Sequence, residues 1–222
     1  MPQHELDLAT ALGRGAPEEV AALIAAGADV RYKRGQGYDA LLDAVHSRDV
    51  GRDPRLLDLL GLLVASGADL NGISAYKESG LRVLSHIGRF DAVRLLLDAG
   101  ADRSQLQWTP LIEAVALGSL GDVERLARDG AALEETDWWS RTAWLVALLA
   151  GDLAKAKVLR ELGANTQARG RCGKPPLFYG TEGHRPEILR WLLSIGQDVE
   201  QADEFGETGR GATGRLPSTG WT

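Results

Sequence analysis

The sequence contains very little cysteine and no long hydrophobic run. Cys172 is the single cysteine among 222 residues, which excludes an internal disulfide and a cysteine-rich zinc site. The longest uncharged stretches, Leu59–Ala68 and Thr142–Gly151, have ten residues each, whereas a membrane span needs roughly 20 apolar residues. The chain begins with acidic residues instead of the positive charge and apolar core of a secretory signal. These absences predict a soluble protein of a reducing, cytoplasmic compartment.

Basic charge is also scarce relative to acidic charge. The 25 lysines and arginines face 31 aspartates and glutamates, a net charge of −6, so neither nucleic acid nor a membrane surface is an expected partner. A chain that is 44% hydrophobic and 25% charged is typical of one globular domain or a short repeat array. Twenty of the 25 basic residues are arginine, which favours a GC-rich genome and hence a bacterial source.

The usual sequence signatures of catalysis are missing. There is no Gly-x-Ser-x-Gly, glycine-rich phosphate loop or His-Glu-x-x-His. Of the four histidines, His46 and His86 fall late in two successive predicted helices, which stack about 8–10 Å apart, but they lack a third metal ligand. Cys172 lies beside Arg171 without a placed histidine and is interpreted as an incidental thiol. We therefore expect no enzyme activity, cofactor or metal, and an enzyme or ligand-binding protein that uses His46, His86 or Cys172 is the least favoured hypothesis.

A tripeptide similar to Gly-Ala-Asp recurs along the chain. An apolar run at helical spacing precedes each occurrence, which predicts a helix with one buried face that stops at the glycine in a left-handed conformation. The intervals between glycines are 40, 33, 30, 33 and 33 residues, with the glycines at Gly27, Gly67, Gly100, Gly130, Gly163 and Gly196.

A second recurring tripeptide begins 21 residues before the glycine in most repeats. It reads Thr-Pro-Leu at 109–111, Thr-Ala-Trp at 142–144 and Pro-Pro-Leu at 175–177. Threonine caps a helix, and proline at the first helical position gives up an N–H that has no intrahelical partner. Each repeat is therefore predicted to contain a turn, a first helix, a short loop and a second helix.

Thr-Pro-Leu at the start of one helix and Gly-Ala-Asp after the next, at a period of 33, resemble the ankyrin repeat. The resemblance implies an all-α solenoid of about six helix-turn-helix units with short β-hairpin or turn connections. The expected ankyrin-repeat domain covers residues 1–208, with repeats at about 1–33, 34–73, 74–103, 104–136, 137–169 and 170–202 and the start of a seventh at 203–208.

Three irregularities interrupt this pattern. The interval of 40 places about seven extra residues at Ser47–Asp53, after which Asp53 and Pro54 are expected as N-cap and first residue of the next helix. The interval of 30 predicts a stunted hairpin between Gly100 and Thr109. Residues 209–222 have almost no apolar content, which predicts a disordered tail; a truncated array, or an open end that a partner covers, is the alternative.

The tryptophans divide into core and surface candidates. Trp144 replaces the leucine of Thr-Pro-Leu and Trp191 lies inside an apolar run, so both are expected in the core. Trp108, just before Thr109, is assigned equally to core and surface. Trp138 and Trp139 fall at the tip of a predicted hairpin, where the family resemblance implies contact with partners, and exposed aromatic pairs cost solubility unless they are covered.

The same hairpin register indicates further contact residues. Tryptophan and arginine are the residue types most enriched at binding hot spots. Arg169, Arg171 and Lys174 together provide positive charge for an acidic patch of a partner. The full set of candidates is Tyr38, Tyr76, Gln105, Leu106, Trp108, Trp138, Trp139, Arg141, Arg171 and Lys174.

Repeat stacking creates an extended rigid surface that suits recognition with little ordering cost. The expected function is that of an adaptor or scaffold that binds a protein partner through the hairpin tips and the concave face. The alternative is an immunity-type or inhibitory protein that occludes the active site of a toxin or enzyme. The chain is expected to be a monomer, or to assemble through its uncapped C-terminal end.

Overall fold

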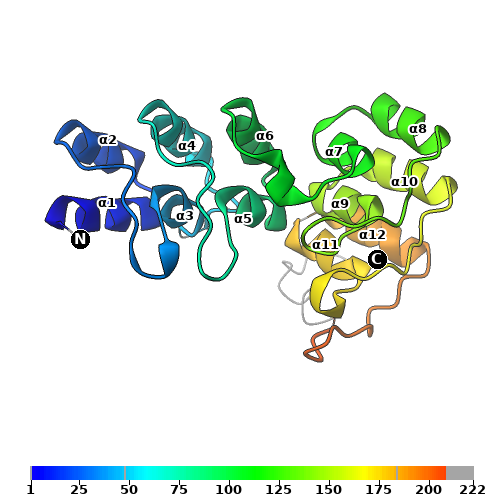
Figure 1. Cartoon of the computed structure of the whole chain (residues 1–222). Helices are drawn as coiled ribbons and strands as arrows, with labels where there is room; N and C mark the ends of the chain where they lie inside the picture. Colours follow the sequence, from blue (N-terminus) through cyan, green and yellow to red (C-terminus); the bar gives the residue numbers. More distant parts are fainter. Residues whose placement is uncertain (1, 48, 184, 209–222) are drawn as a thin grey trace. The chain divides into compact units, whose positions relative to one another are not determined.

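The structure is a computed structural model that describes residues 2–47, 49–183 and 185–208. These residues form twelve α-helices and no β-strand, and their β-type pairing is confined to isolated bridges. The helices group into two compact units that divide between Leu106 and Gln107. We call them the N-terminal unit and the C-terminal unit, and each is described by itself (Figure 1).

The N-terminal unit is built from three helix pairs in two rows. The first helices α1, α3 and α5 stack on one another, and α4 of the second row packs against α2 and α6. In Figure 1, two loops, coloured blue and teal, extend beyond the row of first helices. The bounds of the six helices are α1 Gln3–Gly13, α2 Pro17–Ala25, α3 Ala40–Val45, α4 Leu56–Ala65, α5 Gly80–His86 and α6 Phe90–Asp98.

The C-terminal unit repeats this arrangement. Helix α9 packs against α7 and α11 in the row of first helices, and α8 packs against α10. The bounds of its helices are α7 Pro110–Leu117, α8 Leu120–Arg128, α9 Ala143–Ala150, α10 Leu153–Glu161, α11 Pro176–Glu182 and α12 Pro186–Ser194.

The core of each unit is centred on its middle first helix. All residues of α3 are buried, and in α9 the buried residues run from Ala143 to Leu149. A helix that is apolar around its whole circumference is stable only where neighbours cover it on all sides. Trp144 is 0% exposed, as predicted. Trp191 is half-buried, with its ring centroid 6.4 Å from that of Trp144.

The predicted signals at the helix ends are confirmed. The six repeat glycines have φ between 77° and 97°, for example 96° at Gly163, which is the left-handed region that glycine adopts without a Cβ penalty. Thr109 and Thr142 cap their helices by accepting hydrogen bonds from the N–H groups of Ile112 and Leu145. The 33-residue pattern therefore corresponds to physical helix boundaries.

The predicted start of the helix after the insertion is wrong by two residues. Helix α4 begins at Leu56 with Arg55 as N-cap, instead of at Pro54 with Asp53 as N-cap. The Asp53 carboxylate accepts from the N–H of Arg55 at 2.9 Å, and the N–H of Leu56 donates to the carbonyl of Asp53 at 3.3 Å. Asp53 therefore closes a turn around Pro54 before the helix starts.

The short connection after Gly100 adopts a different conformation from the hairpins, as predicted. Residues Arg103–Leu106 form a single 3₁₀ turn, whereas bridges between 33 and 39, 136 and 142, and 202 and 208 close three of the hairpins. Three fewer residues leave no room for a projecting loop at this position.

The all-helical repeat confirms the predicted fold class. Within the described part of the chain, none of the helices combines the length and apolar character that crossing a membrane requires. The predicted tail at 209–222 and His184 lie outside the described residues. The repeat boundaries and the single domain over 1–208 stay predictions.

Candidate functional site

Each hairpin of the C-terminal unit that begins with aspartate is closed by that residue. One carboxylate oxygen of Asp137 accepts from the N–H groups of Trp139 and Arg141, both at 2.9 Å. Asp203 holds Phe205 and Glu207 in the same way, at 2.9 and 3.0 Å. A side chain that satisfies the backbone of its own turn fixes the loop without help from other elements. The residues between these bonds are therefore presented in a defined conformation.

Adjacent hairpins are joined by main-chain hydrogen bonds. In the C-terminal unit, the N–H of Arg171 donates to the carbonyl of Trp139, and the N–H of Glu204 donates to the carbonyl of Cys172, both at 3.0 Å. In the N-terminal unit, the N–H of Ala75 donates to the carbonyl of Gln36 at 2.8 Å. The hairpins of a unit are thus coupled through their backbones.

Trp138 and Trp139 are half-buried at the tip of the hairpin before α9. The guanidinium carbon of Arg171 lies 5.2 Å from the centroid of the Trp139 ring, a cation–π distance. Arg171 itself is exposed. Each tryptophan therefore combines packing against its own unit with an accessible portion. We define the C-terminal hairpin surface as Trp138, Trp139, Arg171 and Phe205.

Arg141 does not lie on this surface, so its expected contact with a partner is corrected. Arg141 is 1% exposed, and its guanidinium forms an ion pair with Asp137 at 2.5 Å. The sequence register pointed Arg141 outward because a charged residue in a loop is ordinarily solvated. Closure of the hairpin brings it onto the buried carboxylate instead.

Gln105 and Leu106 are corrected for a different reason. They are 6% and 1% exposed, because the shortened connection turns inward at the point where other repeats project a hairpin. The carbonyl of Gln105 accepts from Arg82 Nε at 3.0 Å. Trp108, which the sequence assigned equally to core and surface, is half-buried.

Tyr38 and Tyr76 remain accessible in the N-terminal unit. Tyr76 is 66% exposed, whereas Tyr38 is half-buried and its hydroxyl donates to Glu78 at 3.0 Å. Arg34 lies over the Tyr38 ring at 4.9 Å and pairs with the buried Asp43. We define the N-terminal hairpin surface as Arg34, Tyr38 and Tyr76.

The buried Tyr32 helps to hold Arg34 of this surface in position. The Tyr32 hydroxyl donates to Asp43 at 2.5 Å, and the same carboxylate pairs with Arg34. Burial, followed by the hydrogen bond to Asp43, raises the pKa of Tyr32. Tyr32 therefore stays a neutral donor and fixes Asp43, which in turn fixes Arg34.

Lys174 and Arg171 differ in what balances their charge. Lys174 is half-buried and pairs with Glu182 at 2.5 Å. Arg171 is exposed and interacts with the ring of Trp139. Of these two predicted basic contacts, Arg171 is the one whose charge remains available at the surface.

The predicted set omitted two exposed apolar residues that lie in or beside the hairpins. Phe205 is 75% exposed in the last described hairpin, and Ile73 is 49% exposed beside the hairpin of Tyr76. Phe205 occupies the same position in its hairpin as Trp139, two residues after the aspartate. The sequence register already predicted a hairpin at 203–208. The aromatic residue at the position that corresponds to Trp139 was the signal that could have identified Phe205.

The residues considered for metal binding or catalysis do not assemble into a group. Among the described residues, no set of three histidine, cysteine or acidic side chains is placed to hold a metal ion. His46 is exposed and lies against Tyr38, with ring centroids 5.5 Å apart, and its Nε2 lies 3.7 Å from Glu78. Cys172 is half-buried in its hairpin.

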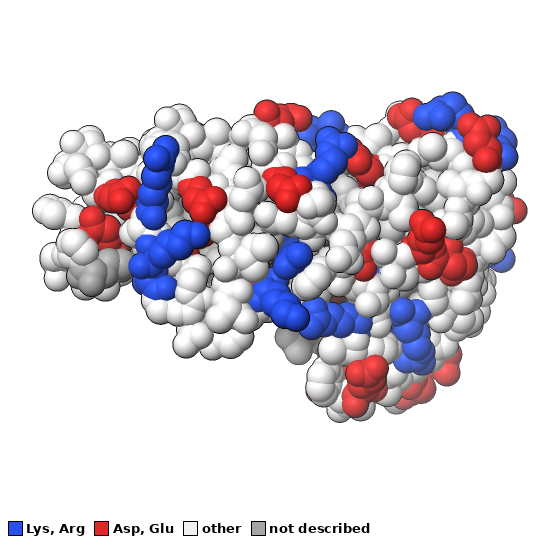
Figure 2. Space-filling model, viewed as in Figure 1, with Lys and Arg blue, Asp and Glu red and all other residues white. Residues whose placement is uncertain are grey.

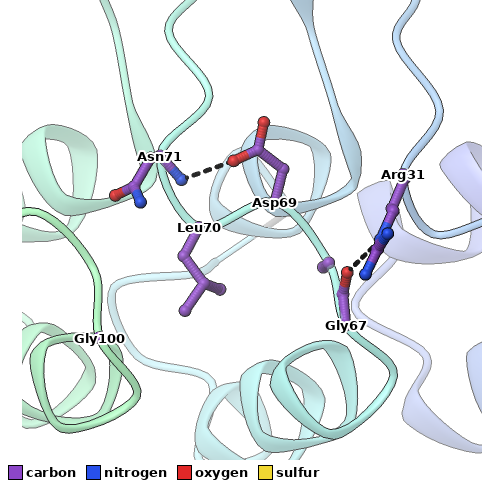
Figure 3. A pocket seen from close by; sticks show the side chains of 7 residues that line it. Arg31, Gly67, Asp69, Leu70, Asn71 and Gly100 are labelled. Carbon is purple, nitrogen blue, oxygen red and sulfur yellow. Dashed lines mark hydrogen bonds between the residues drawn. The ribbon is translucent and has the colours of Figure 1, made fainter.

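A cavity of about 460 Å³ in the N-terminal unit lies among the turns that follow the second helices (Figure 3). Its polar groups mostly bond to one another. Arg31 Nε donates to the carbonyl of Gly67, and the N–H of Asn71 donates to Asp69, both at 2.9 Å, while Lys33 pairs with the other Asp69 oxygen at 3.0 Å. Because few unsatisfied groups converge there, the hairpin surfaces are the stronger candidate sites.

Figure 2 shows how charge is distributed on one face of the molecule. Basic and acidic side chains both lie among uncharged surface on that face, and some basic side chains adjoin one another near the middle of the view.

Comparison with known proteins found no matching family model. The chain is 28% identical to the mitochondrial disaggregase of Homo sapiens over 87% of its length, and 27% identical to ankyrin repeat protein nuc-2 of Neurospora crassa over 64%. It covers 27% of the disaggregase and 14% of nuc-2. Over 43% of its length it is 31% identical to protein phosphatase 1 regulatory subunit 27 of Mus musculus, of which it covers 63%. Together with the helical repeat fold, these similarities confirm the resemblance to the ankyrin-repeat family.

Proposed function

We propose that this chain is a protein-interaction module that binds a protein partner through the hairpin surfaces and the adjoining first helices. The observation that supports this most is the combination of fixed backbones and accessible aromatic rings. The tip of the Trp139 hairpin bonds to its own Asp137 and to Arg171 of the next hairpin. Tyr76 and Phe205 are 66% and 75% exposed.

Rigid aromatic anchors are the side chains that contribute most to protein interfaces. Their burial by a partner releases apolar surface from water with little loss of side-chain freedom. Because the loops are already ordered, binding incurs a small conformational cost. Similarity to proteins named for ankyrin repeats supports the same role, that of an adaptor or scaffold without activity of its own.

Regulation of an enzyme by direct binding is the second candidate. It is favoured by the similarity to a protein named as a phosphatase regulatory subunit, and it includes the inhibitory or immunity-type role predicted from the sequence. The two candidates use the same hairpin surfaces and differ in the partner. A single enzyme bound tightly is expected of an inhibitor, whereas a scaffold binds several proteins more weakly.

The test is affinity capture from a lysate of the source cells followed by quantitative mass spectrometry. Trp138→Ala/Trp139→Ala and, separately, Phe205→Ala are compared with wild type, and Leu120→Ala on α8 is the matched control because Leu120 is 36% exposed away from the hairpins. Circular dichroism checks that each variant is folded. Loss of the same protein from both hairpin variants, with retention by the control, is expected. Unchanged capture by folded hairpin variants would overturn the proposal.

A further inference from the structure

Two arginines near the start of α11 are held in place by uncharged partners. Arg169 Nη1 donates to the carbonyls of Gly173 and Ala202, at 2.7 and 2.8 Å. The guanidinium of Arg171 lies over the ring of Trp139. Both arginines are exposed, and among the described residues neither forms an ion pair with a carboxylate. Their positions are fixed while their charge is not neutralised.

The Glu204 side chain lies beside Gly173 of this hairpin, but among the described residues no carboxylate is within ion-pair distance of either arginine. Lys174, the other basic residue of this hairpin, already pairs with Glu182 at 2.5 Å. Glu204 belongs to the next hairpin and is joined to this one through its N–H, which donates to the carbonyl of Cys172. In a chain with a net charge of −6, two exposed guanidinium groups thus lack an ion-pair partner among the described residues, and one of them, Arg171, lies over Trp139 of the C-terminal hairpin surface.

We propose that Arg169 and Arg171 bind carboxylates of an acidic segment of the partner protein. This inference rests on the proposed function and names the chemistry of the partner at that site. Guanidinium groups donate paired hydrogen bonds to carboxylates and are more weakly hydrated than ammonium groups. Both arginines are held before binding, so little side-chain entropy remains to be lost.

This position suits a phosphate group less well than a carboxylate. Proteins usually hold phosphate with backbone N–H groups at a helix N-terminus in addition to arginine. Helix α11 has Pro175 as its N-cap and Pro176 as its first residue, and proline has no N–H to donate. The hairpin thus offers side-chain donors without a backbone anion site, which favours carboxylates.

The test is selection of binders from a display library of random twelve-residue peptides against the full chain. Wild type, Arg171→Glu, Arg169→Glu/Arg171→Glu and Arg190→Glu are used in parallel. Arg190 lies on α12, is exposed and forms no ion pair among the described residues. Arg190→Glu therefore changes the net charge by the same amount as Arg171→Glu, at a position away from the hairpin. Circular dichroism confirms the fold of each variant.

The expected result is enrichment of aspartate and glutamate among peptides selected by wild type and by Arg190→Glu. Individual acidic peptides should bind Arg171→Glu about tenfold or more weakly, and added salt should weaken their binding to wild type. Three results would each overturn the inference: wild-type binders no more acidic than the starting library, acidic enrichment that persists with Arg169→Glu/Arg171→Glu, or tighter binding when phosphoserine replaces an acidic residue in a synthetic copy of a selected peptide.

These outcomes are separable from failure of the proposed function. If the captured partner is lost on Phe205→Ala but retained with unchanged affinity by Arg169→Glu/Arg171→Glu, the interaction module stands and the acidic-segment inference is wrong. If neither change alters capture, the hairpin surface itself is not the binding site.

Discussion

Arg141 and Asp137 form an ion pair in which each side chain is 1% exposed. Asp137 also accepts from two backbone N–H groups of its hairpin, so one carboxylate joins the loop that carries Trp138 and Trp139 to a buried guanidinium. The hairpin conformation therefore depends on a charge pair inside the protein. Removing one member leaves the other charged and buried.

Arg141→Met is expected to lower the free energy of unfolding by about 3–5 kcal/mol, because the Asp137 carboxylate loses its counter-charge in a buried position. Arg171→Met, which removes an exposed arginine from the neighbouring hairpin, should cost less than about 1 kcal/mol. Urea denaturation followed by circular dichroism measures both. Equal effects of the two substitutions would show that the Asp137–Arg141 pair does not stabilise the hairpin.

Lys155→Met is expected to destabilise the C-terminal unit. Lys155 Nζ donates to the carbonyls of Val115 and Gly118 near the end of α7, both at 2.9 Å. Its removal leaves a buried carbonyl at Val115 and a part-buried one at Gly118 without this donor, at a cost of about 2–3 kcal/mol. Lys157→Met, at an exposed position of the same helix, should change stability by less than about 0.5 kcal/mol. A cost for Lys155→Met no larger than that of this control would show that the hydrogen bonds of Lys155 to the end of α7 do not stabilise the unit.

Gly163→Ala tests the left-handed end of α10. Gly163 has φ of 96°, and no atom lies within 4 Å of the position that an alanine Cβ would take, so backbone strain alone is expected to cost about 1 kcal/mol. Gly61→Ala in the interior of α4, which also has open space around it, should instead stabilise by roughly 0.5–1 kcal/mol. Thermal and chemical denaturation measure the two changes in stability. Effects of the same sign would contradict the claim that Gly163, unlike Gly61, is required for its backbone conformation.

Asp39→Ser should increase stability at neutral pH. Burial raises the pKa of Asp39, because the buried carboxylate is disfavoured in its charged form. The folded state is thus relatively more stable at low pH, and this contribution is lost as the pH rises from the ordinary aspartate range through the raised pKa. Serine keeps the helix cap, as Ser79 does at the start of α5.

The gain from Asp39→Ser should therefore grow with pH and vanish below the ordinary aspartate range. Asp102 provides the opposite sign, since hydrogen bonds from the Ser104 hydroxyl and N–H lower its pKa, and its contribution is present above the ordinary aspartate pKa and lost in acid. Asp102→Ala should destabilise at neutral pH more than in acid. Unfolding curves from pH 3 to 8 measure how the effect of each substitution on stability depends on pH. The same pH dependence for both would contradict the opposite pKa shifts of Asp39 and Asp102.

The repeating helical architecture was predictable because its signals are local. A glycine after an apolar helical run requires a left-handed φ, and Thr109 requires no distant partner to cap its helix. The burial of Arg141 and of Leu106 was not predictable in the same way. The first depends on how the Asp137 turn closes, and the second on where a loop that is three residues shorter directs its side chains. Asp53 shows the same limitation, because a capping residue before proline also favours the turn that it forms here.

The hairpin surface was predictable in part. The register identified the hairpins of Trp139, Tyr76 and Arg171, but a register gives positions along the chain without exposure. Trp139, which Arg171 covers in a cation–π contact, is half-buried, while Phe205 at the corresponding position is 75% exposed. Such differences arise from the neighbouring hairpin, which is 33 residues away in the sequence.

The most direct test of partner binding by the C-terminal hairpin surface is site-specific photo-crosslinking in the lysate of the source cells. The photoreactive residue p-benzoylphenylalanine is introduced in place of Phe205 or, in a separate protein, in place of Leu120, both of which are in the C-terminal unit and exposed. A partner-binding hairpin surface should give one or a few defined crosslinked proteins from position 205 and none of them from position 120. The same products from both positions, or products from position 120 alone, would contradict a partner-binding hairpin surface.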